Sequence, residues 1–215
     1  MSRKAGRRKV ESDLSPRVRP VQKRAKDTVH QILDNAAALL DEVGVDAFNT
    51  NLLAERADVA VRSVYRYYPN KLAVIVGLAE RQAEEWQKSF TQLMVAMADP
   101  KQSAFDAWDA VLEAYVAYLE EKQGRSAIHR AMQALPQLAE VNRRDNDVLS
   151  DAIAAALKAR GVRLPAARLR LISRVLLDTS DVAIDEALSR RGRVPLQLLA
   201  ELKLMHQSYL ARFLD

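Results

Sequence analysis

From Asp27 to the end of the chain, apolar residues recur every three or four positions, which is the spacing of one face of an α-helix. The first such stripe runs from Val29 to Val43 and ends at Gly44. No stretch shows the strict alternation of apolar and polar residues that is typical of a half-buried β-strand. The pattern therefore predicts an all-α protein.

Glycines, prolines and capping residues divide this pattern into about nine helices. Asn49 and Asn70 are each placed to cap the helix that follows, and Asp58 suits a left-handed turn between two helices. The predicted helices span residues 27–44, 50–57, 60–67, 71–97, 103–122, 126–134, 137–160, 166–190 and 196–213.

The second and third helices are short and are joined by the turn 57–60, which predicts a helix-turn-helix whose second helix enters a DNA major groove. Val64 and Tyr68 would pack this second helix against Ile32 and Leu53. The residues then expected on its outer side are Arg62, Ser63, Arg66 and Tyr67.

The segment RSVYRYYPNK at 62–71 holds three tyrosines, two arginines and a lysine, although aromatic residues make up only 6% of the chain. Arginine binds guanine O6 and N7, serine reaches base edges or phosphate, and tyrosine hydroxyls and an ammonium group hold phosphate oxygens. Tyr65 and Tyr67 are expected to present a hydroxyl outward, and Tyr68 to lie in the core. Without the helix-turn-helix, the arginines would be read as solvated surface and the tyrosines as packing.

With these residues in place, the chain resembles the TetR family of transcriptional regulators. The resemblance covers roughly residues 27–78 and rests on ILDNAAALLDEVG followed by FNTNLLAERADVAVRSVYRYYPNK. It implies that certain positions touch operator DNA, two of them (Tyr67 and Lys71) on phosphate. The matching residues are Thr50, Arg62, Ser63, Tyr65, Tyr67 and Lys71, to which the predicted outer face adds Arg66.

The chain departs from the family pattern at three positions. Asp58 stands where the family has a turn glycine and Ala60 where it has a capping serine, at an expected cost of about 1 kcal/mol each. Arg62 replaces a glycine and so adds a cation facing the groove. Asp58 also adds a negative charge near the DNA.

The resemblance implies a helical C-terminal domain that binds an effector and forms a dimer, and the domains are predicted as an arm (1–26), a DNA-binding domain (27–75) and an effector and dimerisation domain (76–215). Large side chains expected to converge on a small hydrophobic effector are Trp86, Phe90, Trp108, Tyr115, Met132 and Leu176. Each of them alone is more often plain core. Asp178 is a polar candidate for a cationic ligand, although exposure or pairing with Arg174 is the more ordinary role.

The last two predicted helices carry apolar residues on more than one face. If one face packs within the protomer, a second apolar surface would be exposed to solvent unless another element buries it. Pairing residues 166–213 with a second copy in a four-helix bundle would supply that cover and would match a palindromic operator. The alternative is that both helices are buried within one protomer.

The net charge of +5 is uneven along the chain. Residues 1–26 hold ten lysines or arginines and two acidic residues, which gives +8 and leaves −3 for the remainder. A proline-containing segment with this charge predicts a disordered arm that follows a polyanion, or else only a solubilising tail.

The sequence contains no cysteine, and its three histidines are far apart, so we expect no metal site and no cofactor. We also expect no membrane segment and a location in the cytoplasm, with the nucleoid. The absence of a phosphate-binding glycine loop, a nucleophile elbow or Glu-x-x-His pairs argues against an enzyme.

The hypothesis that accounts for most of these features is a homodimeric repressor that binds a palindromic double-stranded DNA operator and responds to a ligand. An activator, or a regulator of the same fold without an effector, fits the same sequence. A helical adaptor whose basic arm binds an acidic surface, or an enzyme, fits it less well.

Overall fold

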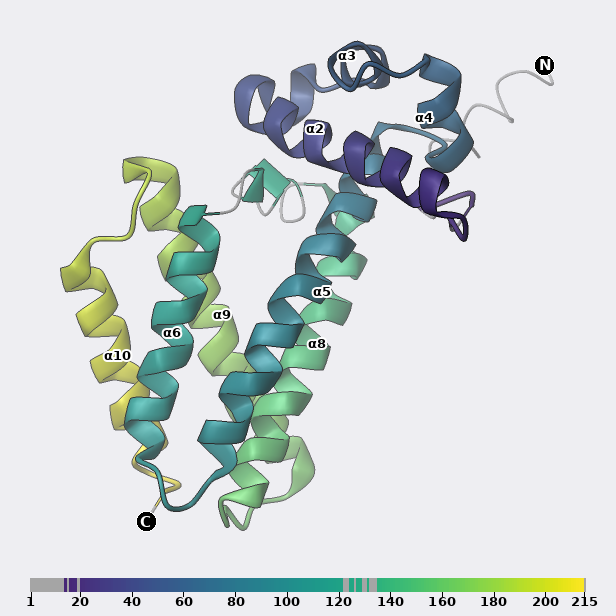
Figure 1. Ribbon diagram of the computed structural model, residues 1–215. Helices are drawn as coiled ribbons and strands as arrows, with labels where there is room; N and C mark the ends of the chain where they lie inside the picture. The colour runs from purple at the N-terminus through teal and green to yellow at the C-terminus, as the bar shows by residue number, and fades with distance from the viewer. Residues whose placement is uncertain are drawn as a thin grey trace. The chain divides into compact units, whose positions relative to one another are not determined.

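The computed structural model of the chain describes residues 14, 16–18, 20–121, 124, 125, 127, 128, 131 and 135–214. Within these residues every regular element is a helix, so the predicted all-α class is confirmed. The described helices are α2 (Lys23–Ala47), α3 (Thr50–Arg56), α4 (Val61–Tyr67), α5 (Lys71–Ala98), α6 (Ala104–Glu121), α8 (Pro136–Ala159), α9 (Ala166–Arg191) and α10 (Leu196–Leu210) (Figure 1).

The chain forms two compact units: Met1–Ala83 with Gln123–Asn142, and Glu84–Lys122 with Arg143–Asp215. The helix predicted at 126–134 lies largely outside the described residues, as does most of the predicted arm. The domain limits at residues 26 and 75 stay predictions. No helix in the described part of the chain has the length and apolar character needed to cross a bilayer.

The first helix differs from its predicted bounds at both ends. It begins at Lys23 instead of Asp27, so the last basic residues assigned to the arm form its first turn. It also continues past Gly44 to Ala47, with a kink at Gly44, whose φ is 69°. Glycine adopts this left-handed conformation without steric cost, which lets the chain bend there without a loop.

The core of the first unit confirms the predicted packing of the helix-turn-helix. Ile32, Leu53 and Val64 are each fully buried, and Tyr68 is buried with them. Helix α3 packs against both α2 and α4 (Figure 1). Burial raises the pKa of Tyr68 to about 12, so the phenol stays neutral in this apolar setting.

Helix α5 approaches the Tyr68 ring so closely that only glycine fits at position 77. A Cβ on Gly77 would lie 2.6 Å from Tyr68 Cε1. Glycine to alanine inside a helix ordinarily stabilises by about 1 kcal/mol. Here we expect Gly77→Ala to lower the free energy of unfolding by about 1–2 kcal/mol, because the buried ring has to shift. Urea unfolding measures the change, and an unchanged or higher midpoint would contradict this packing.

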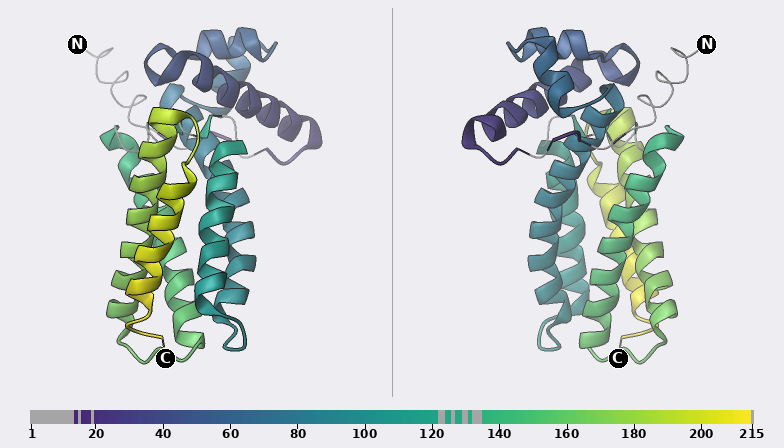
Figure 2. Two further views of the ribbon diagram at one scale, coloured as in Figure 1. Left: turned by 90° about the vertical axis from the view of Figure 1, so that its left-hand side faces the viewer. Right: turned by 90° about the vertical axis from the view of Figure 1, so that its right-hand side faces the viewer.

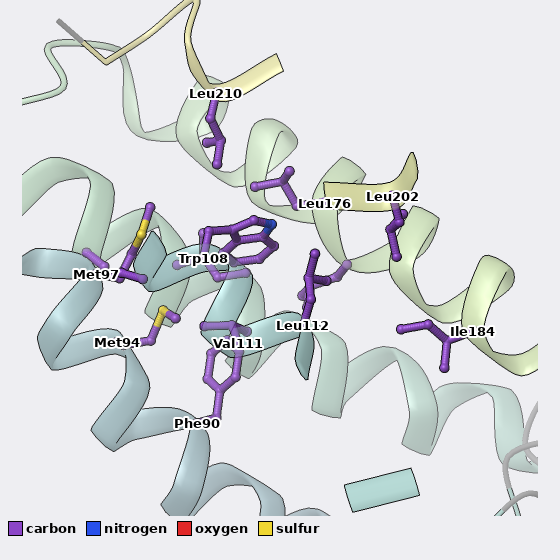
Figure 3. Close-up of a cluster of buried hydrophobic side chains, with 14 of the residues drawn as sticks. Phe90, Met94, Met97, Trp108, Val111, Leu112, Leu176, Ile184, Leu202 and Leu210 are labelled. Atoms are coloured by element: carbon purple, nitrogen blue, oxygen red, sulfur yellow. The ribbon is translucent and has the colours of Figure 1, made fainter. Parts of the chain in front are cut away.

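The second unit is a bundle in which α6, α9 and α10 pack on one another (Figures 1 and 2). Its core surrounds Trp108, which lies among apolar side chains from several helices (Figure 3). The fully buried neighbours in this cluster include Met97, Leu112 and Leu176. This core holds α9 and α10 in place by one face of each helix.

A chain of hydrogen bonds crosses this apolar core and links three helices. Trp108 Nε1 donates to His206 Nδ1 at 3.0 Å, because an indole nitrogen is only a donor. The imidazole proton must therefore sit on Nε2, which donates to Thr179 Oγ1 at 2.8 Å. Thr179 Oγ1 in turn donates to the carbonyl of Val175 at 2.6 Å. The network requires the neutral ring, because Nδ1 accepts a hydrogen bond. Burial lowers the pKa of His206 to about 4, which keeps the ring neutral near pH 7.

Candidate nucleic-acid interface

The helix-turn-helix is shaped by capping and turn residues that can be recognised in the sequence. Asn49 Oδ1 accepts hydrogen bonds from the backbone N–H groups of Asn51 and Leu52 at 3.1 and 3.0 Å, which confirms the predicted cap of α3. Asp58 has φ 48°, so it adopts the left-handed conformation that the turn needs without glycine. Ala60 precedes α4 without a side-chain cap, as its replacement of serine led us to expect.

Helix α4 presents a basic outer face. Arg62 and Arg66 are both exposed, Ser63 is half-buried, and the Tyr65 side chain is 41% exposed. These side chains combine guanidinium donors with two hydroxyl groups. Such groups suit base edges and phosphate oxygens, which are the acceptors that a DNA groove offers.

The predicted outward position of Tyr67 is wrong. Its side chain is only 4% exposed and belongs to the core that contains Val64 and Tyr68. Val64 and Tyr67 are three residues apart and share one face of α4, and Tyr68 follows the helix in an extended conformation. The Arg66 guanidinium lies 5.7 Å from the centre of the Tyr67 ring. We therefore leave Tyr67 out of the proposed DNA-contacting set.

Two further predicted contacts are already engaged within the protein. Thr50 is buried, and its hydroxyl shares a hydrogen bond with the Tyr65 hydroxyl at 3.0 Å, which ties the start of α3 to α4. Lys71 Nζ donates to the carbonyls of Val45 and Asp46 at 3.1 and 3.4 Å. An ammonium group has three protons, so one remains for a phosphate oxygen.

Most of the candidate effector residues lie together in the second unit. Trp86, Phe90, Trp108 and Leu176 lie in the core of the second unit, with Tyr115 packed against it. Tyr115 also donates to Asp181 Oδ1 at 2.8 Å. Met132 lies outside the described residues.

Asp178 does not join this cluster. It is exposed, and its Oδ1 accepts from Arg174 Nε at 2.7 Å, the ordinary role that the sequence suggested for it. The sequence reading missed Tyr118, whose ring stacks on Trp86 with centroids 5.2 Å apart. Its position three residues after Tyr115 on the same helix was the available signal.

Helix α9 has one buried and one exposed apolar face, and α10 also carries exposed apolar residues. Leu171, Val175 and Val182 are 58%, 45% and 66% exposed, and their spacing places them on one stripe of α9. On α10, Leu196, Leu204 and Met205 are also exposed. A groove of about 560 Å³ lies on these helices and is lined by Val182, Ala183, Glu186, Ala187, Arg190, Pro195, Gln197 and Leu198.

The fold and this surface together define a helix-turn-helix protein with a helical second unit. Residues 32–77 match the family described as "Bacterial regulatory proteins, tetR family", and residues 106–210 match "Tetracyclin repressor-like, C-terminal domain". The two matches lie in the expected order and together span most of the chain. The chain belongs to the TetR family.

Curated relatives are similar over the N-terminal part. The HTH-type transcriptional repressor KstR of Rhodococcus jostii is 41% identical over 59 residues, which are 27% of this chain and 28% of that protein. KstR of Mycolicibacterium smegmatis is 35% identical over 72 residues, or 34% and 35% of the two chains. The chain thus matches only about a quarter to a third of the length of these relatives.

Solved structures are similar over nearly the whole chain. A TetR-family transcriptional regulator from Streptomyces coelicolor is 29% identical, with a TM-score of 0.70, and the match covers 87% of this chain and 99% of that one. The fatty acid degradation regulator FadR from Bacillus halodurans has a TM-score of 0.66 at 17% identity, with 88% and 95% covered. This second likeness concerns the fold alone.

Proposed function

We propose that the protein is a transcriptional regulator that binds a palindromic DNA operator as a homodimer. The observation that carries the proposal is the basic, exposed face of α4 within a helix-turn-helix, formed by Arg62, Tyr65 and Arg66. Family membership supports it, as does the similarity of this region to KstR, which is described as a repressor.

The contacts we propose divide by role. Arg62 and Ser63 stand near the start of α4, where recognition helices meet base edges. Arg66, Tyr65 and Lys71 are assigned to base or phosphate contacts farther along. Thr50 acts through its hydrogen bond to the Tyr65 hydroxyl, which orients that phenol. Phosphate contacts place the protein on the duplex, and base contacts specify the sequence.

Dimerisation through α9 and α10 is the second part of the proposal. The exposed stripe Leu171–Val182 and the groove beside it form an apolar surface on one side of helices whose other side is core. A two-fold dimer buries this surface against its own copy. It also presents two helix-turn-helix units to two half-sites of one operator.

Response to a small hydrophobic effector is the third part. The aromatic residues Trp86, Phe90 and Tyr115 and the neighbouring Tyr118 give a ligand an apolar, ring-lined setting, and Asp181 adds a polar group bonded to Tyr115. An effector acts only if it binds the DNA-competent and DNA-incompetent states with different affinity. Helix α5, which begins at Lys71 and carries Trp86 and Phe90, is the proposed route of coupling.

Repression is preferred to activation because the curated relatives are described as repressors. An activator, or a regulator that needs no effector, would use the same DNA surface. A reporter gene placed behind the operator separates repression from activation. Expression that rises when the regulator gene is deleted indicates repression, and expression that falls indicates activation.

The base contact of Arg62 is tested by Arg62→Ala. On the preferred duplex we expect a loss of about 1–3 kcal/mol in binding free energy, with little change on random DNA, because only the preferred site offers the guanine that the guanidinium reads. Fluorescence anisotropy with both duplexes measures the two losses. Arg163→Ala, which removes an exposed arginine outside the helix-turn-helix, is the matched control. Equal losses on both duplexes would make Arg62 a phosphate contact.

A further inference from the structure

A segment that precedes α2 is attached to the end of α4. The backbone N–H of Arg17 donates to the carbonyl of Tyr67 at 2.8 Å, and Arg17 Nη1 donates to the carbonyl of Tyr65 at 3.2 Å. Leu14 packs against the core of the first unit. Leu14 and Arg17, which belong to the predicted basic arm, therefore contact the helix-turn-helix unit.

These two hydrogen bonds are made to carbonyl groups at the C-terminal end of α4. The last four carbonyls of any helix lack partners within the helix. In α4 the Val64 carbonyl accepts from Tyr68 N at 2.9 Å, and Pro69 follows at once with no N–H to offer. Arg17 donates to two of the other carbonyls, those of Tyr65 and Tyr67, although it lies 48 residues before Tyr65 in the sequence. Its positive charge also lies at the negative end of the helix dipole, which is favourable.

Helix α4 is seven residues long, and helices this short are marginal in water unless tertiary contacts hold them. One side of α4 is held by Val64 and Tyr67 in the core. Its start has no side-chain cap at Ala60. The two bonds from Arg17 therefore add, at the far end of α4, to the core contacts that keep the helix ordered and in one orientation.

We infer that Arg17 is a positioning residue for DNA recognition: it closes the carbonyl end of α4 and holds the helix in the register from which Arg62 reads base edges. This inference rests on the proposed DNA-binding function. A loosened α4 would still bring positive charge to phosphates, but it would no longer hold one side chain against one base. Loss of Arg17 therefore reduces discrimination between sequences more than it reduces binding as such.

Three variants of the full-length chain test this role. Arg17→Ala removes the guanidinium bond, and Arg17→Pro removes the backbone donor as well. Arg163→Ala is the charge-matched control, since Arg163 is exposed and lies outside both the helix-turn-helix and the basic segment 1–26. Each protein is titrated by anisotropy on the selected operator and on a scrambled duplex of equal length, and hydrogen exchange is followed at the α4 amides.

We expect Arg17→Ala to reduce the ratio of the two affinities by about fivefold, as one hydrogen bond would, and Arg17→Pro to reduce it further. Amide exchange in α4 should speed up in the same order, and the control should change neither the ratio nor the exchange rates. If Arg17→Pro does not fold, the comparison of Arg17→Ala with the control decides.

Two results would overturn the inference. Equal losses on both duplexes, with a salt dependence shallower by about one phosphate contact, would make Arg17 an electrostatic contact only. If Arg17→Ala changes neither the ratio of the two affinities nor the amide exchange rates of α4, Arg17 has no part in positioning the helix. If the wild-type protein itself shows no preference between duplexes, the proposed function fails, and the α4 exchange rates alone decide whether Arg17 holds the helix.

Discussion

Val182→Asp is expected to convert the proposed dimer to monomers and to weaken operator binding by about a hundredfold or more. Val182 is 66% exposed, lies on the apolar stripe of α9 and lines the groove beside α10. In a two-fold interface each substitution occurs twice, so two carboxylates would be buried without partners. Binding of two half-sites by one particle raises affinity by 10²–10⁴ over a single contact, and this gain is lost with the dimer.

Analytical ultracentrifugation measures the change of mass, and anisotropy on the operator measures the loss of affinity. The matched control is Val95→Asp, which introduces the same charge at a valine that is 69% exposed on α5, away from the α9 stripe in sequence. The control should remain a dimer with wild-type affinity. A dimeric Val182→Asp protein with full affinity would place the interface elsewhere.

The second large effect is a loss of stability in mild acid caused by His206. The unfolded chain binds a proton at the ordinary pKa of 6.5, whereas the folded protein resists protonation until about pH 4. Between these values the unfolded state holds more protons, so stability falls as the pH falls. We expect this group to remove about 2 kcal/mol of unfolding free energy between pH 7 and pH 5 and to have little effect above pH 7.

Protonation also breaks the network itself, because an imidazolium ring cannot accept the bond from Trp108 Nε1 at Nδ1. Urea unfolding at pH 7 and at pH 5 measures the effect. His206→Gln does not titrate in this range, so its loss between the two pH values should be smaller than that of the wild type by about 2 kcal/mol. His30→Gln, at an exposed position on α2, should keep the wild-type difference. Equal pH dependence in all three proteins would contradict this role of His206.

Much of the fold could be predicted because its signals are local. Helical periodicity located the helices, and Asn49 and Asn70 cap α3 and α5 as expected, with Asn70 Oδ1 accepting from Ala73 N at 2.8 Å. Asp58 was recognised as a left-handed turn residue and has that conformation. The helix-turn-helix could be assigned from the sequence for the same reason, since its helices, turn and caps lie within about twenty residues.

The parts that could not be predicted depend on contacts distant in the sequence or on the residue at which a helix ends. Helix α4 ends at Tyr67, which shares its inner face with Val64, and Tyr68 follows in an extended conformation, so both tyrosines are buried. The hydrogen bond between Trp108 and His206 joins residues 98 positions apart, and the two bonds of Arg17 join the segment before α2 to α4. Local sequence periodicity does not identify such pairs. The sequence around a histidine or an arginine does not show which distant residue will be its hydrogen-bond partner.

The central claim is that α4 reads DNA in a two-fold assembly, and selection from a random duplex pool tests it most directly. The purified protein is incubated with the pool at physiological salt, and bound duplexes are amplified and sequenced over several rounds. The account predicts enrichment of a palindrome that is lost when Arg62→Ala protein is used. Failure to enrich any sequence, or the same enrichment with Arg62→Ala, would contradict it.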